Sequence, residues 1–255
     1  PTVTVLVAPR TTLTLGFEHA RDERTADRGI PSAAATLAPF ETDRSTFFGN
    51  ADQSEARSTV NGFSAVLEHD FGGGTQIKNN FRATYYDKFY QNVFANGAVT
   101  GAGLVRIEAY NNTDKRTNIF NQTDLTTKFS AGGVDHTLLA GLELGHQDSS
   151  SVRKNGFFGA ATFLNVAAGS PYAVATDFRA AGTTGDNVVK VDLAAVYLQD
   201  QIALSKEWKL LAGLRYDHFK TSFDDRRTLV AATDLARTDN ELSPRLGLTW
   251  SPGAN

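Results

Sequence analysis

A period of two in hydrophobicity, repeated over long stretches of the chain, most constrains the fold. In 12–18, for example, Leu13, Leu15 and Phe17 alternate with polar or small residues. Successive side chains of a β-strand point to opposite faces, so this pattern predicts strands with one apolar and one polar face. Eight such strands are predicted, besides a shorter apolar run at 2–7. They lie within 11–22, 58–70, 75–90, 118–129, 137–147, 188–204, 208–217 and 242–250.

The connections between these strands alternate between short and long. Short turns rich in Gly, Pro or Ser are predicted at 8–10, 71–74, 131–133, 205–207 and 251–253. Long polar links are predicted at 24–57, 92–116, 149–187 and 225–239. Links of this length are uncommon inside a compact soluble domain. Short turns at one end and long loops at the other are typical of an outer-membrane β-barrel.

The polar faces of the predicted strands also favour a barrel in lipid. They carry charged side chains that would be costly in a soluble core and are tolerated on a watery lumen. These are Lys78, Arg82, Asp124, Lys128, Glu143, Arg215 and Arg245. Aromatic residues flank the short turns, where a membrane interface would hold them. We predict that Phe71, Phe129, Trp208 and Trp250 belong to such an interface girdle.

Composition excludes several other classes of protein. The net charge of −3 argues against a broad basic face for nucleic acid. The chain contains no cysteine, which excludes disulfides, thiolate metal sites and cysteine nucleophiles. It has no apolar run of about 18 residues, so no membrane-spanning helix is predicted. It also begins in the middle of an apolar alternating run and contains no methionine, so we expect a piece of a longer protein.

Several short motifs follow one another along the chain in a characteristic order. They include the Asp27-Arg28-Gly29-Ile30-Pro31 loop, Phe47-Phe48-Gly49, Tyr197-Leu198-Gln199-Asp200, Gly213-Leu214-Arg215-Tyr216-Asp217 and Ser243-Pro244-Arg245-Leu246-Gly247. In this order and spacing the chain resembles, over essentially its whole length, the barrel of TonB-dependent siderophore receptors of Gram-negative bacteria. The resemblance extends to the branch that includes ferric-catecholate receptors.

The resemblance implies a fold and a set of partners. The fold would be all-β: an antiparallel transmembrane barrel segment of eight or nine strands, from a barrel of about 22 strands with a plugged lumen. Residues 1–255 would form a partial outer-membrane barrel domain without the plug, the TonB box or the C-terminal strands. The parent would import a ferric siderophore with energy from the TonB complex, reached through a missing N-terminal part. It would contact outer-membrane lipid and lipopolysaccharide and bind no nucleic acid.

Candidate ligand contacts lie in the first long link and at the top of the third predicted long strand. Arginine offers charge and a planar donor fork to an anionic chelate, and aromatic rings offer stacking surface. The candidates are Arg24, Arg28, Arg44, Tyr86, Phe89 and Tyr90. Of the adjacent tyrosines, alternation predicts that Tyr86 faces the lumen and Tyr85 the lipid. Loop arginines that pair with nearby carboxylates would instead serve only structure.

Other functions remain open at this stage. A passive porin or adhesin would share the barrel pattern, and energy coupling would distinguish it. A barrel enzyme is a further alternative, with His19 or His218 as base, although no serine is marked as a nucleophile. The histidines form no close pair typical of a metal site. We therefore expect no catalytic residues, no metal site and no cofactor, with iron arriving inside its chelator.

Overall fold

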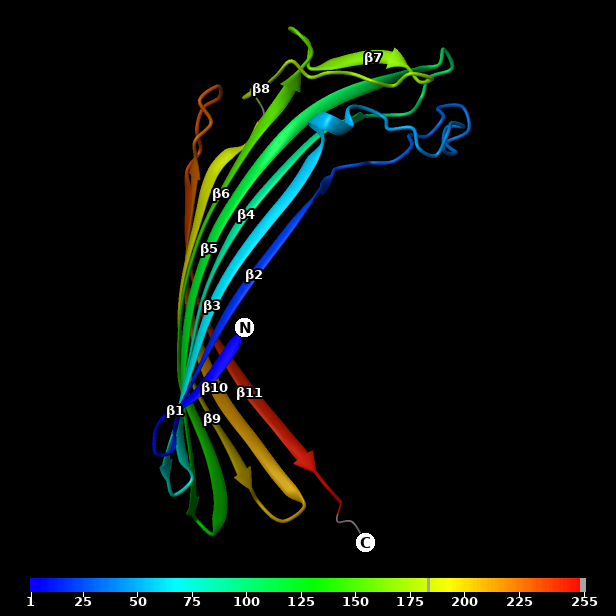
Figure 1. Ribbon diagram of the computed structural model, residues 1–255. Helices are drawn as coiled ribbons and strands as arrows, with labels where there is room; N and C mark the ends of the chain where they lie inside the picture. The colour runs from blue at the N-terminus through cyan, green and yellow to red at the C-terminus, as the bar shows by residue number, and fades with distance from the viewer. Residues whose placement is uncertain (183, 253–255) are drawn as a thin grey trace.

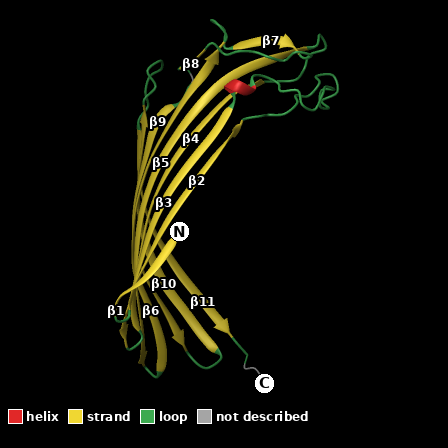
Figure 2. Ribbon diagram, viewed as in Figure 1, coloured by secondary structure: helices red, strands yellow, loops and turns green. Residues whose placement is uncertain are grey.

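The predicted strands pair into one antiparallel sheet in the computed structural model, which describes residues 1–182 and 184–252. The order along the sheet is β1-β2-β3-β4-β5-β6-β9-β10-β11, and the short strands β7 and β8 pair with β5 and β6. The strands are β1 (Thr2–Ala8), β2 (Thr11–Thr25), β3 (Glu55–Gly72), β4 (Thr75–Ala95), β5 (Leu104–Ala131), β6 (Val134–Phe157), β7 (Phe163–Ala167), β8 (Asp177–Arg179), β9 (Asp186–Ala203), β10 (Trp208–Asp225) and β11 (Leu235–Trp250). The sheet bends as one curved wall, with the short turns at one end and the long links at the other (Figures 1 and 2).

The eight predicted long strands and the additional run at 2–7 are therefore confirmed. Three of the four long links, however, were predicted too long. The predicted link 92–116 contains the first part of β5, 149–187 contains the end of β6, and 225–239 contains the start of β11. The strand ends at 149–157 and 235–239 are largely polar and show little alternation. The start of β5 alternates only over a short run, through Val105, Ile107 and Ala109. Backbone pairing with neighbouring strands nevertheless continues through them.

The short turns have the backbone that tight hairpins require. Gly73 and Gly74 have φ angles of 61° and 82°, and Gly132 and Gly133 have 60° and 82°. Positive φ at both central residues is the type I′ pattern, whose twist matches that of the flanking strands. The turn predicted at 251–253 reaches Gly253, which lies outside the described residues. Within the described ranges, no helix combines the length and hydropathy needed to cross a membrane.

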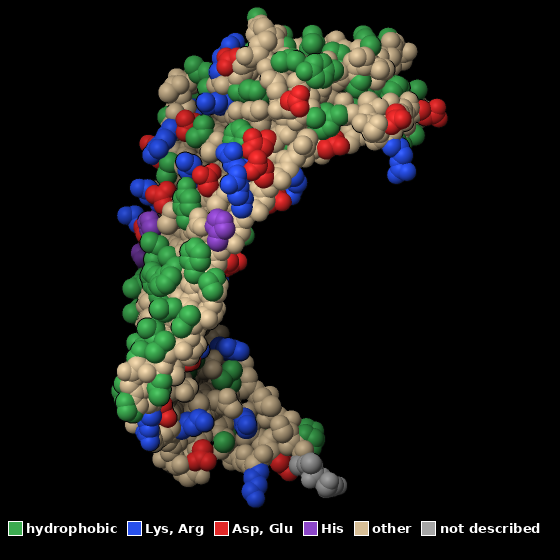
Figure 3. Space-filling view, in the orientation of Figure 1, with side chains coloured by type: hydrophobic (Ala, Val, Ile, Leu, Met, Phe, Trp, Pro, Cys, Tyr) green, Lys and Arg blue, Asp and Glu red, His purple; other side chains and the backbone are tan. Residues whose placement is uncertain are grey.

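The two faces of the sheet differ in chemistry. On one face, cross-strand neighbours such as Phe17 with Phe63 and Leu198 with Leu214 continue an apolar surface from strand to strand. Many of these side chains are exposed, up to 80% for Leu246. Figure 3 shows hydrophobic side chains concentrated in a band, with charged side chains more frequent toward both ends. A surface this apolar is stable against lipid and costly in water.

The buried core lies at the link end of the sheet rather than between sheet layers. Its members share near-complete burial, and they are Phe48, Val93, Val99, Val105, Ile107, Ala109, Ala168, Ala173 and Ala175. They hold the long links against the upper parts of β4 and β5. Gly49 makes this packing possible, because its φ is 139° and a Cβ there would lie 1.7 Å from the Val93 carbonyl oxygen.

Candidate functional site

The polar face of the sheet holds the candidate site at the link end of β4, β5 and β6. Along β4, alternation continues without a register shift from Gln76 to Ala95. Tyr86 and Tyr90 therefore share the polar face, whereas Tyr85 and Phe89 lie on the other face. The structure thus places Tyr86 and Tyr85 on the faces that alternation predicts. It separates Phe89 from the two tyrosines with which it was predicted to act.

Arg28 reaches from the first long link onto this face and is surrounded by aromatic rings. Its guanidinium carbon lies 3.6 Å from the centre of the Phe94 ring. Its Nη2 donates to the Tyr110 hydroxyl at 2.6 Å, and its Nε donates to the Tyr90 hydroxyl at 3.3 Å. The two tyrosine rings pack with their centres 5.6 Å apart. Cation–π stacking and two hydrogen bonds therefore fix the position of this arginine.

A second arginine completes the cluster from β6. The Arg153 guanidinium carbon lies 3.8 Å from the Tyr110 ring centre, so Tyr110 contacts two guanidinium groups. We call Arg28, Tyr90, Phe94, Tyr110 and Arg153 the upper cage. Among the described residues, neither arginine of the cage forms a salt bridge. The cage therefore presents positive charge together with aromatic surface.

Sequence reasoning missed three members of the upper cage. Phe94, Tyr110 and Arg153 fall in segments predicted as links. Phe94 could have been found by continuing the alternation past Tyr90, because every second residue from Tyr86 onward shares one face of the strand. Arg153 lies in a polar stretch where no alternation marks the strand, and Tyr110 directly follows the short alternating run that starts at Val105. Only the pairing between strands brings Tyr110 and Arg153 together.

The other predicted loop arginines do not join the upper cage. Arg24 donates to Asp22 at 2.9 Å, and both side chains are more than half exposed. Arg44 is exposed within the first long link. Phe89 lies beneath Arg57, whose guanidinium carbon is 5.4 Å from the ring centre. Their roles in ligand binding remain predictions, whereas Arg28 and Tyr90 are the predicted residues that the structure brings into contact.

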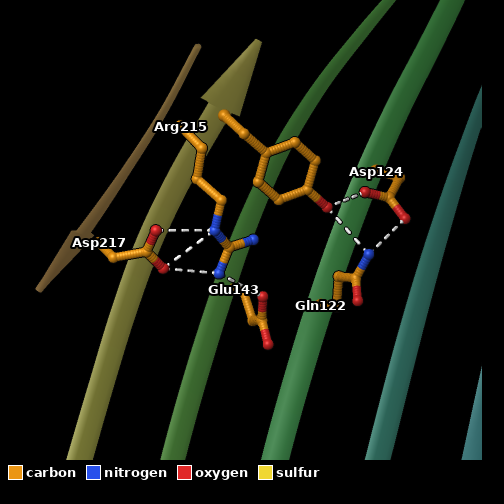
Figure 4. Close-up of polar contacts among 6 residues, drawn as sticks. Gln122, Asp124, Glu143, Arg215 and Asp217 are labelled. Atoms are coloured by element: carbon orange, nitrogen blue, oxygen red, sulfur yellow. Dashed lines mark hydrogen bonds and ion pairs between the residues drawn. The ribbon is translucent and has the colours of Figure 1, made fainter. Parts of the chain in front are cut away.

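Lower on the polar face, the charges are paired with one another. Arg215 Nε donates to both Asp217 carboxylate oxygens at 2.9 Å, and its Nη2 donates to Glu143 at 2.8 Å (Figure 4). On the neighbouring strands the Tyr197 hydroxyl donates to Asp124 and accepts from Gln122 at 2.9 Å. The cation at the middle of the wall is thus neutralised by carboxylates, in contrast to those of the upper cage.

The four predicted girdle residues all lie on the apolar face next to short turns. Phe129 stacks on His136 with ring centres 4.9 Å apart, and Phe71 packs edge-on against His69 at 4.4 Å. Trp208 and Trp250 face each other across β10 and β11. Each of the four is at least 40% exposed. This placement suits an interface belt, and their contact with lipid stays a prediction.

One carboxylate at the link end of β10 has a strongly altered pKa. Asp225 accepts hydrogen bonds from Arg227 Nε at 2.8 Å and from the Thr233 amide at 3.1 Å. The Arg227 side chain, and after it the backbone amides of Arg227 and Thr233, hold the pKa of Asp225 well below its ordinary value of 3.8, against the opposing effect of burial. The carboxylate therefore fastens the link that follows β10.

Comparison with known proteins gives a consistent result. The family model described as "TonB dependent receptor-like, beta-barrel" matches residues 3–255. The metal-pseudopaline receptor CntO of Pseudomonas aeruginosa is 26% identical over 98% of this chain, which spans 35% of that relative. The crystal structure of the siderophore receptor PiuA from Acinetobacter baumannii matches 99% of this chain and 39% of its own, with a TM-score of 0.79 and 22% identity.

A second solved structure agrees in fold. The ferric-catecholate import receptor Fiu from Escherichia coli, in its open form, matches all of this chain and 44% of its own, with a TM-score of 0.78 and 20% identity. At these identities the structures establish the fold alone, and the chain spans about a third of CntO. The family model covers nearly every residue. The chain therefore belongs to the family of TonB-dependent receptor-like β-barrels of the Gram-negative outer membrane.

Proposed function

We propose that the protein containing this chain binds a ferric siderophore at the extracellular end of the polar face and imports it with energy from the TonB complex. The observation that carries the proposal is the upper cage. Two arginines and three aromatic rings meet there on the lumen-side face, next to the long links. Ferric siderophores of the catecholate class are anionic and aromatic, and such a cage complements both properties.

The domain organisation is part of this proposal. The sheet ends in two unpaired edges, β1 and β11, and lipid does not tolerate an open edge. We infer that residues 1–255 are a partial barrel domain, which further strands of the same protein close. A plug and a TonB-contacting segment would lie elsewhere in that protein. Its outer surface would contact lipid and lipopolysaccharide.

Uptake of radiolabelled ferric siderophore by cells that express the complete receptor tests the proposal. We expect accumulation that requires both the receptor and TonB, and that falls when Arg153→Gln removes one cation of the upper cage. Accumulation that is unchanged in cells without TonB would instead indicate a passive barrel. No accumulation of any ferric chelate in cells with TonB would refute the proposed transport.

A further inference from the structure

Directly below the upper cage, the polar face contains a hollow that the cage does not use. Its volume is about 600 Å³, within the range of small-molecule sites. Its lining includes Tyr86, Lys88, Asp114, Arg116, Ser149 and Ser151. We call these six residues the basic hollow.

The basic hollow is built from two neighbouring rows of the sheet. In one row Lys88 pairs with Asp114, and Asp114 pairs with Ser151. In the next row Tyr86 pairs with Arg116, which pairs with Ser149. Rows that share a face lie about 7 Å apart along a strand. Because three long strands, β4, β5 and β6, define these positions rather than a loop, the arrangement is rigid.

The charges of the basic hollow are incompletely balanced. The lining contains three cations, Lys88, Lys115 and Arg116, of which alternation places Lys115 on the opposite face. It contains a single carboxylate, Asp114, which already accepts a hydrogen bond from Asn112 at 2.5 Å. In the described part of the chain, neither Lys88 nor Arg116 forms a salt bridge.

The wall below behaves differently. There Arg215 contacts two carboxylates, and Lys78 lies 2.8 Å from Glu68. The unpaired Lys88 and Arg116 therefore resemble the two arginines of the upper cage and differ from Arg215 and Lys78.

The remaining lining specifies what kind of ligand would fit. Ser149 and Ser151 offer hydroxyl groups on the same face as the two cations, and each hydroxyl can donate or accept. Tyr86 adds an aromatic ring, with Lys88 Nζ 5.9 Å from its centre. The Asn118 side-chain oxygen, which also lines the hollow, is buried and accepts no hydrogen bond from the described residues. Cations and hydroxyls together recognise a ligand with several negatively charged or hydroxylated oxygens.

We propose that the basic hollow is an anion-binding site of its own, one step below the upper cage, for an anionic and oxygen-rich metal chelate. The inference rests on the proposed function and deepens it, because it specifies the charge of the chelate. It assigns to Lys88 and Arg116 the selection of anionic over neutral chelates. The upper cage consists of other residues, Arg28 in the first long link and four on β4, β5 and β6, so the two sites can be altered separately.

The test measures affinity of the complete purified receptor for two probes: an anionic ferric tris-catecholate and a neutral ferric tris-hydroxamate. In the double variant Lys88→Gln/Arg116→Gln, we expect the affinity for the anionic probe to fall about tenfold or more. The neutral probe should change less than about twofold. Restoring charge as Lys88→Gln/Arg116→Lys should recover a substantial part of the loss. Lys128→Gln/Lys209→Gln, which removes the same number of positive charges near the short turns, is the matched control and should leave both affinities unchanged.

A further variant separates the hollow from the cage. With Arg153→Gln in the upper cage, an intact basic hollow should still prefer the anionic probe. Loss of that preference, an equal loss for both probes in the double variant, or no loss for the anionic probe would overturn the inference. If the unaltered receptor binds only the neutral probe, the inference about the basic hollow fails, but the proposed function as a ferric-siderophore receptor does not. If the unaltered receptor binds neither these nor any other ferric chelates, the proposed function itself fails.

Discussion

At the scale of single residues, Arg28 fastens the first long link to the wall. It combines the stacking on Phe94 with hydrogen bonds to two tyrosines, which together stabilise the contact by about 2–3 kcal/mol. We expect Arg28→Ala in the complete receptor to raise the rate of proteolytic cleavage within residues 26–54 by tenfold or more. Arg21→Ala, which removes only an exposed pair with Glu23, is the control. An unchanged cleavage rate for Arg28→Ala would contradict the fastening role.

Gly141 allows a second close contact, on the wall itself. A Cβ at this position would lie 2.0 Å from the Tyr197 ring, so Gly141→Ala must displace the ring and weaken its bonds to Asp124 and Gln122. Overpacking of this kind costs about 1–3 kcal/mol. We therefore expect the complete receptor with Gly141→Ala to unfold at a lower urea midpoint than the unaltered receptor. At Gly247 the nearest atom would be 3.6 Å away, so Gly247→Ala should leave the midpoint nearly unchanged. Equal midpoints for the two variants would contradict this reading.

Residue-level predictions from sequence succeeded where alternation applied. The placement of Tyr86 and Tyr85 on opposite faces followed from the period of two, and the same rule could have placed Phe89 away from Tyr86 and Tyr90. Arg28 was predicted from its chemistry, but its aromatic partners depend on strand pairing. Arg153 and Tyr110 belong to different strands, and no local pattern relates them.

At the scale of elements, the strands continue well past the apolar band. Above the band no lipid-facing hydrophobic surface is required, so the alternation that predicts a strand becomes short or weak while its backbone hydrogen bonds remain. At the start of β5 it persists only where Val105, Ile107 and Ala109 belong to the buried core. For this reason the predicted strand ends near the short turns agree with the structure. Those at the link ends of β5, β6 and β11 fall short of it.

The link that follows β10 should loosen in acid. The pKa of Asp225 is lowered in the folded protein, so its stabilising contribution is complete well above 3.8 and is lost as the pH falls below that value toward the folded pKa. We expect hydrogen exchange of the amides in 226–234, corrected for intrinsic rates, to show constant protection from pH 8 to pH 5. Protection should then fall below about pH 4. Asp225→Asn should loosen the link already at neutral pH and remove this acid transition. An unaltered acid transition in Asp225→Asn would assign it to another group.

At the scale of the whole molecule, the sheet has two open edges. The outer edge of β11 carries exposed Leu242, Leu246 and Leu248 beside unpaired backbone groups. An edge of this kind pairs readily with another chain. We expect the 255-residue chain, refolded alone in detergent, to form polydisperse assemblies rich in intermolecular β-structure, as measured by light scattering and infrared spectroscopy. The complete receptor is the control. A monodisperse monomer of the chain alone would show that its edges are stable without further strands.

The stacked tryptophans have a consequence for optical experiments. The chain contains two tryptophans, and both belong to one pair with ring centres 6.0 Å apart at the short-turn end of β10 and β11. The indole emission of this segment therefore reports a single location, at the opposite end of the wall from the upper cage. Brominated lipids with labels at graded depths should quench it as one population and so calibrate how deeply the wall is immersed. Ligand binding or movement among the long links should not change this emission. A tryptophan introduced into a long link would therefore report on that link without a contribution from another tryptophan of this chain nearby.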